Sequence, residues 1–197
     1  MPRPRQYDPE TVLDAAESLA VAGGPAAVTI RAVAAATGMS NGAIYHTFPS
    51  RAELLARTWI RAAQRFLAVQ DELAGAHTGV DAVIAAADAP VEFARRYPQS
   101  TRMFFAVHSS DLTATDLPDP VRAEVEAPQR ALVGLMKRLA LDLWGRRDAA
   151  AVDTLTICLV DLPTAILLDR DRLADPTARE QLRAAVRAVL TVGPAPK

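Results

Sequence analysis

The residues of this chain whose types and spacing could do chemistry gather in one short stretch of its N-terminal third. Asn41 carries an amide that can form paired hydrogen bonds with the edge of an adenine. Gly42 and Ala43 have little or no side chain, so they permit a close approach to a groove or a contact with a thymine methyl group. Tyr45 and His46 can reach phosphates. These side chains could recognise double-stranded DNA if they share the free face of one helix.

Two residues that flank this stretch could bind the DNA backbone. Thr29 is placed to open one helix and Arg51 to open another, so a hydroxyl and a charge stand at helix N-termini, where phosphates bind. Ser40 is expected to cap the helix that carries the base-reading residues. Two plainer readings stay open, because Tyr45 could belong partly to the core and His46 could be a solvated surface residue.

Residues for catalysis are sparse. The three histidines, His46, His77 and His108, are not spaced as metal ligands, and the chain lacks the motifs of zinc proteases, serine hydrolases and phosphate-binding loops. Asp161 is an odd carboxylate in an apolar helix. It could be a catalytic group with a raised pKa, but a satisfied buried polar group or a ligand contact is favoured, because it has no acid-base partner. Cys158 is expected to be a buried structural thiol. We therefore expect no enzyme, no metal and no cofactor.

The DNA-contacting residues need two helices joined by a tight turn. Thr29 can cap the first helix, and Gly38 can supply the left-handed residue that ends it. Ser40 can cap the second helix, which Pro49 stops. Ser50 then begins a third helix, with Glu53 placed three residues later as in a capping box. This order of elements, with a free polar face on the second helix, is typical of a DNA-binding helix-turn-helix. A plain helical hairpin has the same periodicity and is the alternative.

The segment SNGAIYHTFPSRAELL, residues 40–55, resembles the recognition-helix segment of the TetR family of transcriptional repressors. The shared features are a Ser, a small-residue pair, a Tyr, a Phe and a basic residue opening the next helix. The resemblance implies a ligand-responsive regulator that binds a palindromic operator as a homodimer. This family often has Lys where Asn41 and Arg51 stand, so the operator sequence does not carry over.

Composition and charge agree with a two-part globular protein. Half of the 197 residues are hydrophobic, and the net charge is -1. Residues 1–65 hold seven Arg against five acids, whereas the remainder holds fifteen basic residues against eighteen acids. The acidic C-terminal part disfavours a non-specific DNA-compacting protein, because it would repel DNA. The N-terminus lacks the apolar core of a signal peptide, and we expect a cytoplasmic protein with no membrane partner.

The periodicity of apolar residues predicts an all-α fold with about nine helices and no strand. We expect a DNA-binding domain over residues 1–49 and a ligand-binding and dimerisation domain over 50–197. The helix predicted over residues 50–73 would link the two. Arg3 and Arg5 form a short N-terminal arm that could touch DNA or be a plain terminus. The helices predicted over 120–144 and 148–168 carry more apolar surface than one small core needs, and we expect them to form the dimer.

Three prolines predict a cavity in the C-terminal domain. Pro90, Pro128 and Pro163 each remove a helical hydrogen bond, so their helices cannot pack as straight rods. We expect a small, largely apolar ligand there. A helical enzyme or a ligand-binding protein that uses this cavity is the alternative from another class. The residues expected around the ligand are Arg102, Met103, Phe104, Phe105, His108, Trp144, Asp161 and Leu162.

Overall fold

The computed structural model describes residues 8–196, and every regular element among them is helical. This confirms the predicted all-α fold. The arm residues Arg3 and Arg5 lie outside the described residues. The elements are α1 (Pro9–Gly23), η1 (Pro25–Ala27), α2 (Ile30–Thr37), α3 (Asn41–Thr47), α4 (Arg51–Gly75), α5 (Gly79–Ala87), α6 (Ala89–Arg96), α7 (Pro98–Ala106), α8 (Ser109–Thr113), α9 (Asp119–Trp144), α10 (Ala149–Thr156), η2 (Ile157–Asp161), η3 (Thr164–Leu168) and α11 (Pro176–Val192).

The described chain has eleven α-helices where about nine were predicted, and two segments account for the difference. The sequence pattern predicts one helix over residues 81–97 that Pro90 interrupts, and the structure divides it there into α5 and α6, because Pro90 stands in the first turn of α6 and cannot continue the hydrogen bonding of α5. Residues 109–118 are polar and end at a proline, which predicts a loop, but this segment contains the short helix α8. The predicted helix over 148–168 is continuous, but it changes to π-helical turns, η2 and η3, on either side of Pro163.

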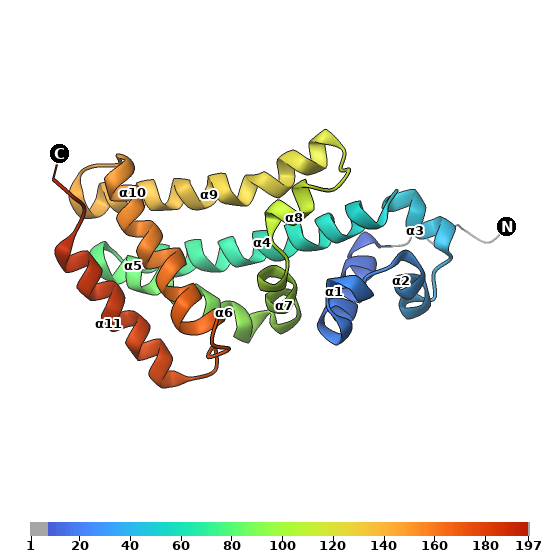
Figure 1. Cartoon of the computed structure of the whole chain (residues 1–197), viewed down its shortest axis with the longest axis horizontal. Coiled ribbons are helices and arrows are strands. Elements are labelled where there is room, and N and C mark those ends of the chain that lie inside the picture. Colours follow the sequence, from blue (N-terminus) through green and yellow to red (C-terminus); the bar gives the residue numbers. More distant parts are fainter. Residues whose placement is uncertain (1–7, 197) are drawn as a thin grey trace. The chain divides into compact units, whose positions relative to one another are not determined.

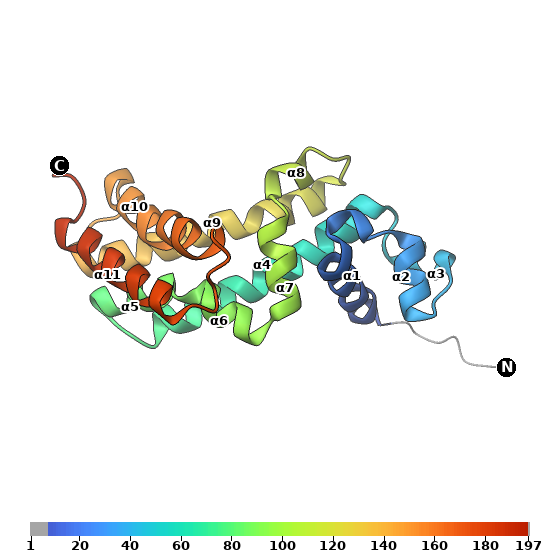
Figure 2. The same ribbon diagram turned by 60° about the horizontal axis from the view of Figure 1, so that its bottom comes forward.

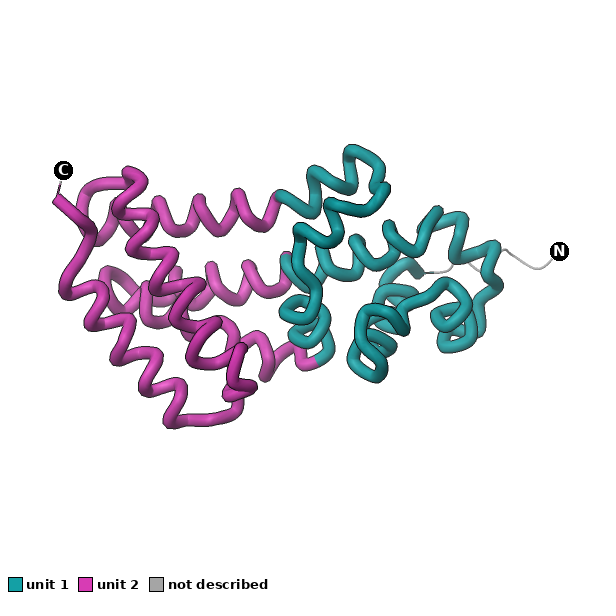
Figure 3. Tube along the Cα trace, in the orientation of Figure 1, with its two compact units in different colours: residues 1–63, 99–126 teal, residues 64–98, 127–197 magenta. Residues whose placement is uncertain are grey.

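The chain packs as two compact units, which Figure 3 colours separately. Unit 1 comprises residues 1–63 and 99–126, and unit 2 comprises residues 64–98 and 127–197. Helices α4 and α9 each contribute residues to both. These units differ from the predicted domains, since α7, α8 and the beginning of α9 pack in the same unit as α1 to α3. The functional boundary near residue 49 stays a prediction.

The core of unit 1 forms where α1, α2 and α3 pack on the first half of α4 (Figure 2). Asp8 caps α1 by accepting a hydrogen bond from the Glu10 N–H, and Pro9 opens its first turn. Leu19 is partly covered by this core, and the apolar residues buried in it include Leu13, Val28, Ile30, Val33, Ile44 and Phe48. Trp59 extends the core toward α7, because its indole N–H donates to the Val107 carbonyl at 3.0 Å.

A buried cation on α4 joins it to α1. The Arg61 side chain is 10% exposed, and its guanidinium lies 2.8 Å from Glu10, 2.9 Å from Asp14 and 3.1 Å from Glu17. Burial by itself would lower the pKa of Arg61, but the hydrogen bond with Glu10 and the charges of Glu17 and Asp14 outweigh it and raise that pKa. Glu17 is itself buried and accepts a hydrogen bond from Ser100 of α7. Three helices of unit 1 therefore meet at one ionic cluster.

Unit 2 is built around α5, the second half of α9, the helical stretch from α10 through η3, and α11 (Figure 1). Val83, Leu155, Leu167 and Leu182 are fully buried in its core. The second half of α4 belongs to the same unit. Its Phe66 packs edge-on against Phe93 of α6, with ring centroids 5.4 Å apart.

The helical stretch Ala149–Leu168 of unit 2 is strongly apolar although much of it is not buried. Residues Ala149–Leu168 have a mean hydropathy of 1.8, so by length and composition alone they could cross a membrane. A core helix of a globular protein passes the same test, and this stretch packs against α5 and α11. Only 39% of its apolar window is buried, which leaves apolar surface that the described chain does not cover.

The Arg61 cluster predicts a large loss of stability from a single truncation. Arg61→Ala leaves Glu17 buried beside Ser100 without its cation, so the free energy of unfolding should fall by about 3–5 kcal/mol. Arg95→Ala is the matched control, because that side chain is 71% exposed and solvent screens its pair with Glu92, which should contribute little to stability. Urea unfolding measures both. Equal losses in the two variants would contradict the structural role of the cluster.

Candidate nucleic-acid interface

The turn between α2 and α3 has the geometry that the sequence predicts. Thr29 caps α2 by accepting a hydrogen bond from the Ala32 N–H at 3.1 Å. Gly38 ends α2 in the left-handed conformation, with φ of 69°. Ser40 then caps α3 by accepting a hydrogen bond from the Ala43 N–H at 3.2 Å. The helix-turn-helix is therefore confirmed at the level of its local geometry.

Helix α3 is buried on one side and exposed on the other. Ile44 is fully buried and Phe48 is 4% exposed, so they anchor the helix in the core of unit 1. Asn41, Gly42 and His46 lie on the exposed side together with Tyr45, which is 51% exposed. The alternative that places Tyr45 partly in the core is therefore wrong. The structure brings together a polar face that can enter a groove.

Arg51 has a structural role that sequence reasoning missed. Its Nε donates to the Val28 carbonyl at 2.7 Å, and its Nη2 donates to the Pro25 carbonyl at 2.8 Å. These bonds fasten the first turn of α4 to the segment that precedes Thr29. The guanidinium keeps its charge and further N–H donors, so a phosphate contact stays a prediction, but its loss would also loosen the start of α2.

Arg31 is a candidate that sequence reasoning did not single out. It is exposed in the first turn of α2, two residues after the Thr29 cap. Its guanidinium makes no hydrogen bond or ion pair with the residues that the structure describes, so its charge is available for a phosphate. Its position just after a helix cap was the signal that could have revealed it.

The residues predicted to bind a ligand are divided between the two units. Arg102, Met103, Phe104, Phe105 and His108 belong to unit 1, whereas Trp144, Asp161 and Leu162 belong to unit 2. The site that they would form together stays a prediction.

The burial of two of these residues bears on their roles. Met103 is 1% exposed and is part of the core of unit 1. Asp161 is exposed, so the interpretation of it as a buried, satisfied carboxylate is wrong. Its position between the turns of a π-helical segment explains the error, because the 3.6-residue periodicity used to place it does not hold there.

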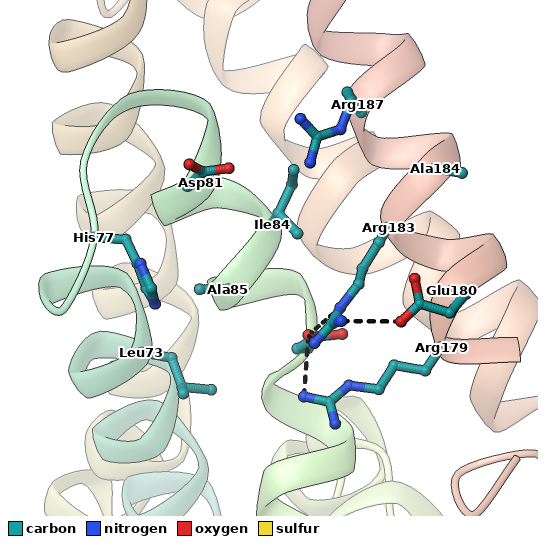
Figure 4. A pocket seen from close by; sticks show the side chains of 11 residues that line it. Leu73, His77, Asp81, Ile84, Ala85, Arg179, Glu180, Arg183, Ala184 and Arg187 are labelled. Carbon is teal, nitrogen blue, oxygen red and sulfur yellow. Dashed lines mark hydrogen bonds and ion pairs between the residues drawn. The ribbon is translucent and has the colours of Figure 1, made fainter. Parts of the chain in front are cut away.

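Unit 2 contains a pocket that the sequence did not predict. It has a volume of about 530 Å³ and is lined by Leu73 and by residues of the turn after α4, of α5 and of α11 (Figure 4). None of the eight predicted ligand residues lines it. The arginines at this pocket all come from α11.

Two kinds of reactive site, a metal centre and a nucleophilic thiol, can be checked in the part of the chain that the structure describes. No set of three or more His, Cys, Asp or Glu residues there could hold a metal ion. Cys158 is buried, and burial raises the pKa of its thiol to about 12. The thiol is therefore protonated at neutral pH and inert as a nucleophile, in agreement with the structural role predicted for it.

Comparison with known proteins places this geometry among bacterial regulators. Residues 12–58 match the family model described as bacterial regulatory proteins, tetR family. No curated protein matches the chain. A transcriptional regulator from Rhodococcus sp. is 20% identical, covers 97% of this chain and all of its own length (100%), and superposes with a TM-score of 0.71.

Two further solved structures have the same fold. The TetR family transcriptional regulator PfmR from Thermus thermophilus is 18% identical, with 91% of this chain and 97% of that chain covered and a TM-score of 0.67. A TetR transcriptional regulator from Legionella pneumophila is 17% identical, with 94% and 98% covered and a TM-score of 0.68. At these identities the likeness establishes the fold.

Two glycines of the helix-turn-helix predict opposite phenotypes. Gly38→Ala should lower the free energy of unfolding by about 1–2 kcal/mol, because φ is 69° there and an L side chain is strained in that region. Gly42→Ala adds a methyl group at an ordinary van der Waals distance, 4.0 Å, from Ser40 Oγ, and should leave the fold intact while weakening DNA binding. Thermal unfolding and fluorescence anisotropy with bound DNA separate the two effects. Undiminished DNA binding by Gly42→Ala would contradict a close approach of α3 to DNA.

Proposed function

We propose that this chain, which belongs to the TetR family of transcriptional regulators, is a repressor that binds a palindromic operator as a homodimer. A small, largely apolar ligand would release it from DNA. The observation that carries the DNA-binding part is the exposed polar face of α3, held on a turn whose two helices are both capped by side chains. An activator would use the same face.

Each exposed residue of the helix-turn-helix is suited to one kind of DNA contact. The amide of Asn41 can pair with an adenine edge, and Gly42 and Ala43 let the helix approach the bases. Tyr45 and His46 can bind phosphates from the same helix. Thr29, Ser40 and the cations Arg31 and Arg51 lie at helix starts, where backbone N–H groups also favour an anion. One such helix reads few bases, so useful specificity requires a second copy.

The uncovered apolar surface of unit 2 supports dimerisation. Leu141 of α9 is 51% exposed, and more than half of the apolar window in Ala149–Leu168 is unburied. Surface of this kind marks protein interfaces. We propose that α9 and the stretch from α10 through η3 meet their copies in a second subunit. Leu135 and Leu159 are 5% and 4% exposed, so they belong to the core of unit 2 and would be poor probes of this interface.

Aromatic residues of α7 support the ligand proposal. Phe104 and Phe105 are half-buried, with ring centroids 5.0 Å apart, and Phe104 also stacks at 5.6 Å on Trp59 of α4. An apolar ligand that covers these rings would act on α4 directly. Helix α4 runs without interruption from Arg51 to Gly75, so a shift of its ligand-contacting turn moves its first turn as well. A differential affinity of about 3 kcal/mol between two states would lower operator binding on the order of 150-fold.

The first test is selection of DNA from a random pool, followed by anisotropy measurements on the selected duplexes. We expect a palindrome whose half-sites are spaced by one helical turn, roughly 34–36 Å. Asn41→Ala should reduce the preference for one base at one half-site position by about 1–3 kcal/mol. Arg31→Ala should weaken binding to all DNA sequences equally and reduce the salt dependence of the affinity. Equal affinity for random and selected DNA at physiological salt would refute the proposal.

The dimer is tested by sedimentation at micromolar concentration. Leu141→Glu should give folded monomers, because the residue is exposed and Lys137 and Arg138 one turn earlier favour a carboxylate there. Leu135→Glu is the control for the fold and should unfold the protein, because it places a charge in the core. Circular dichroism distinguishes the two outcomes. A wild-type chain that sediments as a monomer would contradict the dimer.

The ligand proposal is tested by screening hydrophobic metabolites and drugs for two effects in one assay. A true ligand should raise the melting temperature and release the operator, and Phe105→Trp should change which compounds do both. Arg95→Ala, which alters an exposed side chain outside the predicted ligand set, serves as the control for thermal stabilisation. Compounds that stabilise the protein without ever releasing DNA would contradict ligand-controlled binding.

A further inference from the structure

We propose that the pocket of unit 2 between α5 and α11 binds a small organic carboxylate with an apolar body. Its volume of about 530 Å³ falls in the range of sites for small molecules, roughly 300–1,000 Å³. It belongs to one compact unit and shares no residue with the predicted apolar site or with the DNA-binding face. The proposal is therefore independent of operator binding.

One side of the pocket can hold a hydrocarbon. Leu73 from the end of α4 lies on this side with Ile84 and Ala85 of α5 (Figure 4), and Ala184 of α11 also lines the pocket. Leu73 and Ala85 are half-buried, so a ligand can still cover part of their surface. His77, in the turn after α4, and Asp81, in the first turn of α5, stand at the rim of the same side. This wall favours an apolar body several carbons long.

The other side of the pocket is basic. Arg179, Arg183 and Arg187 follow one another at single-turn intervals along α11 and line its opening (Figure 4). Asp88 is buried, and its Oδ2 accepts hydrogen bonds from Arg183 Nε at 2.7 Å and from Arg179 Nη2 at 3.2 Å. This bond with Asp88 is the largest cause of the raised pKa of Arg183. The side chain of Arg183 is therefore fixed at the edge of the pocket.

Hydrogen-bond donors exceed acceptors along this side. Each guanidinium has five N–H donors, while the acceptors bonded to it here are Asp88 and Glu180, which Arg183 contacts at 3.0 Å. Arg179 Nε and the acceptor Asp88 Oδ1 are both buried with no hydrogen-bond partner among the described atoms. Arg187 is exposed, and its guanidinium has no partner within the described part of the chain. The carboxylate of Asp81 lies opposite these N–H donors, in the first turn of α5. The dipole of α5 already stabilises its negative charge there.

A ligand that fits both sides must supply acceptor oxygens at one end and apolar surface at the other. A carboxylate matches the planar fork of a guanidinium and forms charge-assisted hydrogen bonds with it. A cation would meet Arg187 and Arg183 at the opening and be repelled. A neutral alcohol would gain the apolar contacts but leave the unpaired donors unsatisfied.

The experiment compares three probes of equal chain length, octanoate, octanol and octylamine, on the full-length wild-type protein. Isothermal titration calorimetry gives the affinity, and thermal unfolding gives an independent signal of binding to the folded state. Octanoate should bind more tightly than octanol, and octylamine should bind most weakly. Arg187→Gln should lower the affinity for octanoate about three- to tenfold, because one exposed charge-assisted hydrogen bond is lost.

Two further variants locate the binding. Arg170→Gln is the matched control, because Arg170 is also exposed and does not line the pocket, and it should leave octanoate binding unchanged. Ala184→Trp should abolish octanoate binding by filling the opening from an exposed position of α11. The proposal is overturned if the wild type does not bind octanoate at millimolar concentration, or if octanol binds as tightly. Octanoate binding that survives both Arg187→Gln and Ala184→Trp would place the ligand elsewhere and also overturn it.

Discussion

The orientation of the DNA-reading helix depends on one buried charge. Glu10, Asp14 and Glu17 stand at helical intervals along α1, and the single guanidinium of Arg61 on α4 lies within ion-pair distance of all three. Removing a charge from water costs several kcal/mol, which is recovered only where the partners are well placed. The cluster therefore permits one rotation of α1 about its axis. Since α1 packs on α2, and α2 on α3, that rotation fixes the direction of the polar face of α3.

Local signals in the sequence predicted this region well. The capping side chains of Asp8, Thr29 and Ser40 each accept a hydrogen bond from an N–H group no more than three residues away. Gly38 adopts the left-handed backbone conformation that ends α2. Such features need no knowledge of distant residues. The contacts of Arg61 and Arg51 were missed because their partners lie far along the chain, at Glu10 and at Val28. A cation in an amphipathic helix looks like a solvated residue until the packing of another helix is known.

The C-terminal part was harder to predict, for a related reason. Two of the three prolines, Pro90 and Pro163, correctly indicated irregular helices, and the three differ in their outcome. Pro90 begins a new helix, Pro128 stays inside α9, and Pro163 is flanked by π-helical turns. None of these three outcomes determines where a cavity forms between the helices. The pocket in unit 2 comes instead from the spacing of arginines along α11 and from the buried Asp88 opposite them, which only the packing of α5 on α11 reveals.

Specific DNA binding would require both the helix-turn-helix and the proposed dimerisation region. A helix as short as α3 offers few base contacts, so a monomer would bind DNA mainly through its phosphates and without selectivity. Linking two such helices makes the second contact intramolecular, and it is lost if the geometry forbids both at once. In the proposed dimer, a ligand would therefore not need to touch α3 to release the operator. Because α4 begins at Arg51, which is hydrogen-bonded to the segment before α2, a modest shift of α4 would change the spacing of the two recognition helices in that dimer.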